Sequence, residues 1–232
     1  MRYRVFVPGG AGPHPVVYLL HGHGGDEGNW FDHSGVVAEA QRHGLAVVTP
    51  DGGNSWYVNS ATERWEDYIA HDLAREVEGR FPVARAREGR AIAGLSMGGY
   101  GAVKIALRYP GRFVFAASTS GAFDTTRATS VFNPRGTSSN VLEVFGPPGS
   151  VVRRENDVYR MAAEVSDPSV LPYLRIDCGT DDPWFGINEE MAAALYARGI
   201  AHDFIASPGH HNWPYWNRSI VDIMAEAARR LR

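Results

Sequence analysis

Short apolar runs that end in glycine- or proline-rich loops mark the first half of the chain. Residues 16–20, 45–48 and 91–93 form three such runs. Continuous runs of this length, without polar alternation, are typical of strands that are buried on both faces of a parallel sheet. Residues 1–7 instead alternate between polar and apolar positions, which predicts one further strand.

Helical periodicity fills the intervals between these runs. Apolar residues recur at spacings of three and four over residues 65–81, which predicts a helix with one core-facing stripe and a charged outer face. The same spacing over residues 99–109 predicts a second helix, which Pro110 ends. We also expect strands at 113–117, 174–178 and 202–206 and helices at 187–198 and 216–231. Strands that alternate with helices predict a doubly wound α/β fold with a mostly parallel sheet.

One long segment interrupts the alternation. Residues 121–172 are rich in Ser, Thr, Asn, Pro and Gly, and only 141–145 and 159–165 show weak periodicity. Long insertions of this kind usually cover a binding site. Because 232 residues suit one α/β domain, we expect a single domain over residues 1–232 with a lid-like insertion at 121–172.

The composition argues against several classes of protein. The 23 basic and 26 acidic side chains give a net charge of −3, without the basic stripe that nucleic-acid binding requires. No apolar run reaches the roughly 20 residues of a membrane span, and the N-terminus lacks the apolar core of a signal peptide. We therefore expect a cytoplasmic protein. The single cysteine, Cys178, cannot form an intrachain disulfide or a multi-cysteine metal site. Nothing in the sequence indicates an oligomeric state.

The sharpest chemical signal is the segment GLSMGG at residues 94–99, between a predicted strand and a predicted helix. A serine in Gly-x-Ser-x-Gly at such a turn is the nucleophile elbow of α/β-hydrolases, where the glycines allow close backbone approach and the tight turn exposes the hydroxyl. The alternative is an ordinary serine in a glycine-rich turn. The strand before it and the helix after it favour Ser96 as a nucleophile.

A serine nucleophile needs a histidine base and a carboxylate that orients the histidine. In α/β-hydrolases the carboxylate and then the histidine follow the serine, each at the end of a later strand. The strand at 174–178 leads into Asp181 and Asp182, and the strand at 202–206 leads into His210 and His211. Spacing alone leaves both pairs open.

The third requirement is an oxyanion hole made of two backbone N–H groups. The N–H of Met97, directly after the serine, is one candidate. The loop after the strand at 16–20 reads HGHGG, and we assign the second N–H to His23. His21 and His23 have no third ligand at a matching spacing, so we expect no metal site and no cofactor.

Tryptophans concentrate in or beside the loops that carry these residues. Aromatic side chains commonly line pockets for apolar acyl or aryl groups, whereas others of the same kind simply fill the core. We expect Trp56, Trp184 and Trp213 to contact the substrate.

Taken together, these segments resemble the esterase D family of α/β-hydrolases over nearly the whole chain, and least across residues 121–172. The resemblance rests on LHGHGG at 20–25, PDGGNSWY at 50–57, GLSMGGYGA at 94–102, CGTDD at 178–182 and GHHNWPYW at 209–216. The family's Cys-Gly-Thr-x-Asp pattern implies Asp182 as the acid, and its Gly-Gly-His-Asp-Trp pattern implies His211 as the base. This chain departs from the second pattern at His210 and Asn212.

The family includes S-formylglutathione hydrolases, feruloyl and acetyl-xylan esterases, tributyrin-type esterases and mycolyltransferases. The resemblance therefore implies a serine carboxylesterase that hydrolyses short-chain acyl or aryl esters through an acyl-enzyme, with a small-molecule ester as its partner. The alternatives are an acyltransferase of the mycolyltransferase type and a thioesterase of the S-formylglutathione type. A non-catalytic α/β binding module is a further alternative, against which the order serine, acid, histidine argues.

Overall fold

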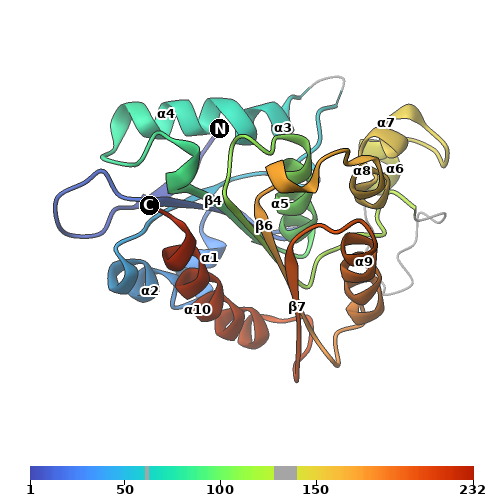
Figure 1. Ribbon diagram of the computed structural model, residues 1–232. Coiled ribbons are helices and arrows are strands. Elements are labelled where there is room, and N and C mark those ends of the chain that lie inside the picture. Colours follow the sequence, from blue (N-terminus) through green and yellow to red (C-terminus); the bar gives the residue numbers. More distant parts are fainter. Residues whose placement is uncertain (61–62, 128–139) are drawn as a thin grey trace.

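The computed structural model describes residues 1–60, 63–127 and 140–232. Within these residues, seven strands form one sheet in the order β1-β3-β2-β4-β5-β6-β7 (Figure 1). Only β1 is antiparallel to its neighbour, and the other adjacent strands are parallel. The strands are β1 (Tyr3–Phe6), β2 (Val16–Leu20), β3 (Ala46–Pro50), β4 (Arg90–Leu95), β5 (Phe115–Thr119), β6 (Tyr173–Gly179) and β7 (His202–Ser207). The prediction of a mostly parallel α/β fold is confirmed.

Helices cover both faces of the sheet. In Figure 1, α2 and α10 lie below the sheet, and α3 and α4 lie above it. The helices are α1 (Asn29–His33), α2 (Val36–His43), α3 (Trp65–Asp67), α4 (Leu73–Arg80), α5 (Met97–Arg108), α6 (Val141–Phe145), α7 (Val151–Glu155), α8 (Val158–Glu164), α9 (Phe185–Ala197) and α10 (Trp213–Arg230), with short 3₁₀ turns at Arg87–Gly89 and Pro168–Val170. Among the described residues, no helix is both long and apolar enough to cross a membrane.

Successive residues of one strand pack into opposite cores. Val17 of β2 faces the core formed with α1, α2 and α10, whereas Tyr18 faces the core formed with α4, α5 and α9. All five residues of β2 are buried. Because side chains alternate between the two faces of a strand, burial on both faces requires an uninterrupted apolar run.

Several elements begin or end away from the predicted positions, and two of them show the physical cause. The strand expected at 113–117 is β5, which starts later and continues through the buried polar residues Ser118 and Thr119. The helix expected at 216–231 begins earlier, at Trp213, because the Asn212 side chain accepts a hydrogen bond from the Tyr215 N–H at 3.2 Å and caps the helix. Hydrogen bonds set both boundaries, and the spacing of apolar residues gives no information on hydrogen bonds.

The helix expected at 65–81 is present but carries a π-helical turn, Tyr68–Asp72, between α3 and α4. Its charged residues were expected on the outer face. Glu66 is instead fully buried and pairs with the equally buried Lys104 of α5. The expectation for Glu66 was wrong, because a buried cation on another helix compensates its charge.

The predicted insertion contains α6, α7 and α8. Val158 and Ala162 of α8 are buried in the same core as α5, and the Tyr100 hydroxyl of α5 donates to the Asn156 carbonyl at 2.7 Å. The described part of the insertion is therefore packed onto the sheet's helices. Residues 128–139 of the insertion lie outside the described residues, and a lid function stays a prediction.

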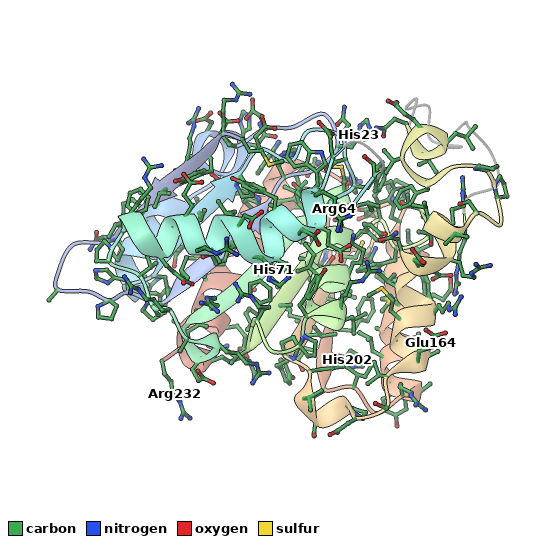
Figure 2. All side chains as sticks on the ribbon, turned by 90° about the horizontal axis from the view of Figure 1, so that it is seen from above. His23, Arg64, His71, Glu164, His202 and Arg232 are labelled. Carbon is green, nitrogen blue, oxygen red and sulfur yellow. The ribbon has the colours of Figure 1, made fainter. Side chains whose placement is uncertain are left out.

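The loops that carry the candidate residues lie at one end of the sheet. Parallel strands place their carboxyl ends on the same edge, which is where α/β proteins bind their ligands. Figure 2 shows His23, which follows β2, at the opposite end of the molecule from His202, where β7 begins. The loops after β2, β4, β6 and β7 thus converge.

Candidate active site

Ser96 occupies the tight turn between β4 and α5. Its backbone has φ 54° and ψ −117°, a region that residues other than glycine rarely adopt. The Ser96 N–H donates to the Thr119 carbonyl at 3.0 Å, and the Ala122 N–H donates to the Ser96 carbonyl at 3.2 Å. The segment after β5 therefore holds the strained turn from both sides.

The glycine-rich loop after β2 lies against this turn. A Cβ atom on Gly22 would come within 2.6 Å of the Leu95 side chain and 3.4 Å of the Ser96 Cβ, so the approach requires glycine. His23 is the next residue in this loop, and Met97 is the first residue of α5. The first N–H groups of a helix have no partner within it. In the described part of the chain, the N–H groups of His23 and Met97 donate to no other group.

The loops after β6 and β7 lie side by side. A Cβ atom on Gly179 would lie only 2.2 Å from the Gly209 carbonyl oxygen. The Asp181 N–H donates to this same carbonyl at 2.9 Å, and the Thr180 N–H donates to the Ser207 carbonyl at 2.9 Å. Backbone contacts therefore set the position of the acidic segment relative to the histidine segment.

Asp182, His211 and Ser96 form one hydrogen-bonded chain. Nδ1 of His211 lies 2.8 Å from Oδ2 of Asp182, and Nε2 lies 3.1 Å from Oγ of Ser96. Because a carboxylate can only accept, Nδ1 carries the proton, and Nε2 accepts the serine hydroxyl. Of the residues that spacing could not separate, Asp181 is exposed, and His210 lies against the Asp181 carbonyl at 3.4 Å, outside this chain.

The Asp182 side chain is fully buried. Burial opposes its ionisation, but hydrogen bonds from His211, from the Trp184 N–H at 2.8 Å and from the Ser120 side chain outweigh burial and hold the pKa of Asp182 below its ordinary value. The carboxylate is therefore charged at neutral pH, as stabilisation of a protonated histidine requires.

Comparison with known proteins identifies the family. A family model described as "Putative esterase" matches residues 1–227. The chain belongs to this esterase family. An acetyl esterase of Caldicellulosiruptor saccharolyticus is 27% identical over 214 residues, which cover 89% of this chain and 80% of the relative. An esterase of Mycobacterium tuberculosis is 33% identical over 226 residues, covering 85% of this chain but 48% of its own length. The chain thus spans about half of that second relative.

A solved structure supports the same assignment. The fluorophosphonate-binding serine hydrolase F of Staphylococcus aureus matches with a TM-score of 0.85 and 27% identity, covering 97% of this chain and 91% of that chain. The α/β-hydrolase fold and the resemblance to esterases that the sequence predicts are both confirmed.

Two of the tryptophans predicted to contact the substrate of this esterase lie close to the predicted site residues. The ring of Trp184 lies 4.6 Å from the ring of His211, measured between centroids. Trp56 is buried, and its Nε1 donates to Oδ1 of Asn140 at 3.0 Å. Nε2 of His23 lies 3.3 Å from the same Asn140 oxygen. Asn140, the residue before α6, therefore joins this helix to Trp56 and to the predicted oxyanion loop, residues 21–25.

The third tryptophan, Trp213, belongs to the other face of the sheet. Its ring packs edge-on against Trp30 at 5.5 Å and Trp216 at 5.3 Å. Trp216 in turn packs edge-on against His211 at 5.0 Å. These contacts place Trp213 one ring away from His211, and a direct substrate contact stays a prediction.

His21 hydrogen-bonds with two backbone groups and so fixes the predicted oxyanion loop. The Gly52 N–H donates to Nε2 of His21 at 2.8 Å, so Nδ1 carries the proton and donates to the Gly22 carbonyl at 2.8 Å. Burial lowers the pKa of His21, which keeps the ring neutral. Within the described residues, no group of three or more His, Cys, Asp or Glu side chains could hold a metal ion.

Two buried polar residues of this region, Asn188 and Ser120, could not be identified from the sequence. The Asn188 side chain accepts from the Gly121 N–H and donates to the Gly121 carbonyl and to the Trp184 carbonyl, each at 2.9 Å. Ser120, beside Gly121, accepts from Nε1 of Trp216 at 3.1 Å. Neither residue lies in a motif for catalysis, and no apolar spacing marks them, because their role depends on contacts between distant segments.

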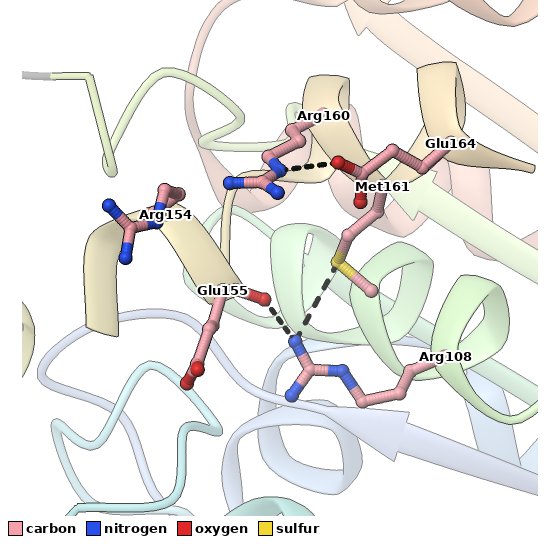
Figure 3. Close-up of a pocket in the computed structure, with 6 residues that line it drawn as sticks. All are labelled: Arg108, Arg154, Glu155, Arg160, Met161 and Glu164. Carbon is pink, nitrogen blue, oxygen red and sulfur yellow. Dashed lines mark hydrogen bonds and ion pairs between the residues drawn. The ribbon is translucent and has the colours of Figure 1, made fainter. Parts of the chain in front are cut away.

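A surface cavity of about 560 Å³ lies elsewhere on this esterase, at the carboxyl end of α5 (Figure 3). It is lined by Arg108, Arg154, Glu155, Arg160, Met161 and Glu164. The 12 residues of α5 separate it from Ser96 by about 18 Å along the helix. Arg108 is engaged by Glu66, and Arg160 by Glu164. This cavity is separate from the site around Ser96.

Proposed function

We propose that this protein is a serine carboxylesterase that hydrolyses short-chain acyl or aryl esters through an acyl-enzyme. One observation carries the proposal: His211 contacts Ser96 through Nε2 and Asp182 through Nδ1, with Ser96 at a strained strand-to-helix turn. This arrangement has the geometry that a serine nucleophile requires. Membership of the esterase family and the acetyl esterase relative support ester hydrolysis.

In the first half of the reaction, Oγ of Ser96 attacks the ester carbonyl carbon while Nε2 of His211 takes the hydroxyl proton. The C–O bond to the alcohol then breaks, and His211 returns its proton to the departing alcohol. Asp182, charged and buried, stabilises the protonated histidine and keeps Nδ1 protonated. The product of this half is an acyl group on Ser96.

In the second half, His211 takes a proton from water, and the water oxygen attacks the acyl carbonyl carbon. The bond between this carbon and Oγ of Ser96 then breaks, His211 returns its proton to Oγ, and the acid is released. The N–H groups of Met97 and His23 bind the negatively charged oxygen in both halves. Their lack of other acceptors in the described residues supports this role. No cofactor or metal takes part in this scheme.

The substrate class rests on the aromatic surroundings. We assign Trp56 and Trp184 as walls for an apolar acyl or aryl group, since one contacts the oxyanion loop through Asn140 and the other contacts His211. Trp213 belongs to the same prediction as an outer contact. A net charge of −3 offers no attraction for an anionic substrate, which favours a neutral ester. The cytoplasm stays the predicted compartment.

The test combines hydrolysis with active-site labelling. The protein is expected to hydrolyse p-nitrophenyl acetate and p-nitrophenyl butyrate and to be labelled at Ser96 by a fluorophosphonate, as shown by peptide mass spectrometry. Ser96→Ala is expected to lose both properties and to keep the circular dichroism of the original protein. A folded protein that does neither would refute the proposal. A panel of acyl chain lengths, including a feruloyl ester, then measures the size of the pocket.

A further inference from the structure

The loop after β3 binds the predicted oxyanion loop on both sides of His23. The Tyr57 hydroxyl donates to the His21 carbonyl at 3.0 Å. On the other side of His23, the Gly24 N–H donates to Oδ1 of Asn54 at 2.7 Å. The residue assigned to the oxyanion hole therefore lies between two hydrogen bonds to one neighbouring loop.

The loop after β3 has an unusual backbone. Trp56 and Tyr57 have φ 55° and 52°, although neither is glycine, and both are buried. Bulky residues rarely adopt this region. Such conformations persist only where the surroundings fix them, and they cluster at functional sites. The strain at Tyr57 thus points to a role beyond packing.

A buried lysine holds the strained backbone. Nζ of Lys104 donates to the Tyr57 carbonyl at 2.6 Å. Lys104 also pairs with Glu66, and both of these side chains are fully buried. Because the attraction within a buried pair often only offsets the cost of removing two charges from water, stability alone does not account for the pair. Its hydrogen bond to the carbonyl fixes the backbone of Tyr57.

Two glycines make room for the Tyr57 ring. A Cβ atom on Gly52 would lie 2.3 Å from Cε1 of the ring, and a Cβ atom on Gly101 of α5 would lie 2.6 Å from Cδ2. Both glycines belong to segments that carry the family resemblance. The ring is therefore confined between the loop after β3 and the helix that begins directly after Ser96.

The Tyr57 hydroxyl is the donor in its contact with His21. Burial raises the pKa of Tyr57 well above its ordinary value, so the hydroxyl keeps its proton. His21 is buried as well, and no other group in the described part of the chain donates to its carbonyl. A buried carbonyl without a donor is costly, which favours its movement toward water. Loss of this hydroxyl should therefore displace the loop that carries His23.

We propose that Tyr57 and Asn54 are positioning residues of the oxyanion hole, which hold the loop on both sides of His23 and align its N–H with the negatively charged oxygen of the reaction. Lys104 supports this role by fixing the backbone of Tyr57. The inference rests on the proposed function of Ser96 and of the His23 N–H. It gives a role to the segment at 50–57, which the family resemblance alone leaves without one.

The test of Tyr57 uses a matched pair of tyrosine variants. Tyr57→Phe removes only the hydroxyl that contacts the His21 carbonyl. Tyr159→Phe is the control, because the Tyr159 hydroxyl donates to the Ile187 carbonyl at the same 3.0 Å. Melting temperature, kcat and KM for p-nitrophenyl acetate, and the inhibition constant of a trifluoromethyl ketone are measured for each. The adduct of such a ketone with a catalytic serine carries a negative oxygen like that of the reaction.

Tyr57→Phe should lower kcat about tenfold, less than the outright loss of an oxyanion donor, and should leave KM within about twofold. The inhibition constant should rise by a similar factor, because the adduct needs the same N–H groups. Tyr159→Phe should lower the melting temperature as Tyr57→Phe does and should keep the original kcat. A folded Tyr57→Phe variant with unchanged kcat and inhibition constant overturns the proposal. An equal loss of kcat in Tyr159→Phe also overturns it.

The test of Asn54 uses a second matched pair at exposed positions, where folding is not at risk. Asn54→Ala removes the acceptor of the Gly24 N–H. Asn217→Ala is its control, because Oδ1 of the exposed Asn217 accepts from the Gly35 N–H at the same 2.7 Å. Asn54→Ala should lower kcat about threefold, since an exposed hydrogen bond contributes less than a buried one, and Asn217→Ala should not. If Tyr57→Phe does not fold, an unchanged kcat in Asn54→Ala overturns the proposal.

The original protein distinguishes failure of this inference from failure of the proposed function. An original protein that shows neither hydrolysis nor fluorophosphonate labelling refutes the function of Ser96. An active original protein whose Tyr57→Phe variant is equally active refutes only the positioning role.

Discussion

Gly98 packs so closely on Leu20 that a Cβ atom on Gly98 would lie 2.4 Å from the Leu20 carbonyl oxygen. The same atom would lie 2.6 Å from the His21 carbonyl oxygen. Gly98→Ala should therefore push the oxyanion loop away from Ser96. We expect kcat/KM for p-nitrophenyl acetate to fall at least about 100-fold, the effect of losing one oxyanion donor.

Gly79 provides the control for this substitution. It lies in α4, where an added Cβ atom would meet nothing within 4 Å. Gly79→Ala should raise the free energy of unfolding by about 0.5–1 kcal/mol, because alanine favours the helix, and should leave kcat/KM unchanged. Original activity in Gly98→Ala would contradict the assignment of the loop.

The two adjacent histidines give a matched pair for the base. His211→Ala removes the group that contacts both Ser96 and Asp182, and we expect kcat to fall by roughly 10⁴- to 10⁶-fold. His210→Ala removes an exposed contact with the Asp181 carbonyl and should keep kcat within a small factor. Steady-state kinetics of the two variants test which histidine is the base. A large loss of kcat in His210→Ala and a small one in His211→Ala would assign His210 as the base.

The strained backbone of Ser96 predicts an inverse relation between activity and stability. Ser96→Gly removes the hydroxyl and also relieves the conformation at φ 54°, whereas Ser96→Ala removes only the hydroxyl. Both variants should be inactive, and Ser96→Gly should be more stable than Ser96→Ala by about 1 kcal/mol or more in urea unfolding. Equal stability of the two variants would show that the turn carries no strain.

Asp182 links stability to pH. Burial opposes its ionisation, but its hydrogen bonds outweigh burial and lower its pKa in the folded state. A group with a depressed folded pKa stabilises the fold above its unfolded pKa, about 3.9 for aspartate, and loses this contribution as the pH falls through the folded value. The free energy of unfolding should therefore decline below about pH 4, and less steeply in Asp182→Asn. Urea titrations from pH 3 to 7 measure both slopes, and equal slopes would argue against a stabilised carboxylate.

The buried pair of Lys104 and Glu66 should matter more than any surface pair. Nζ of Lys104 also donates to the Tyr57 carbonyl at 2.6 Å, and burial lowers the pKa of Lys104 to about 8. Lys104→Met leaves Glu66 with Arg108 as its only cation among the described residues, so we expect the free energy of unfolding to fall by about 3 kcal/mol, the lower end for breaking a buried pair. The same substitution at the exposed Arg64, which pairs with Asp67, should cost less than about 1 kcal/mol. Similar losses in the two variants would contradict this ranking.

Much of the fold could be predicted because burial leaves a direct record in the sequence. The apolar runs at 16–20 and 91–93 became β2 and β4, since burial on both faces excludes polar residues there. The position of Glu66 could not be predicted, because its burial depends on Lys104, 38 positions further along the chain. The end of β5 could not be predicted for a related reason. Ser118 and Thr119 are polar, so the sequence does not indicate that the fold buries them.

Some residues of the candidate site could likewise be predicted from the sequence, and others could not. Ser96 could be predicted from local spacing, because the tight turn itself demands glycines nearby. The choice between His210 and His211 depended on family resemblance, since both follow the same strand within one turn. Ser120 and Asn188 could not be predicted, because their contacts form only when the segment after β5 is assembled with α9 and α10.

The order of the strands in the sheet predicts how the site loses its geometry on denaturation. Ser96 follows β4, which is paired on both sides, whereas His211 follows β7, which in the described residues pairs only with β6 at the edge of the sheet. Edge strands open at a lower free energy than central strands. His211, the proposed base, is thus attached to an edge of the sheet, and Ser96, the proposed nucleophile, to its centre. Under mild denaturation we therefore expect opening at β7 to separate the two residues while the core stays intact, so that inactivation precedes unfolding.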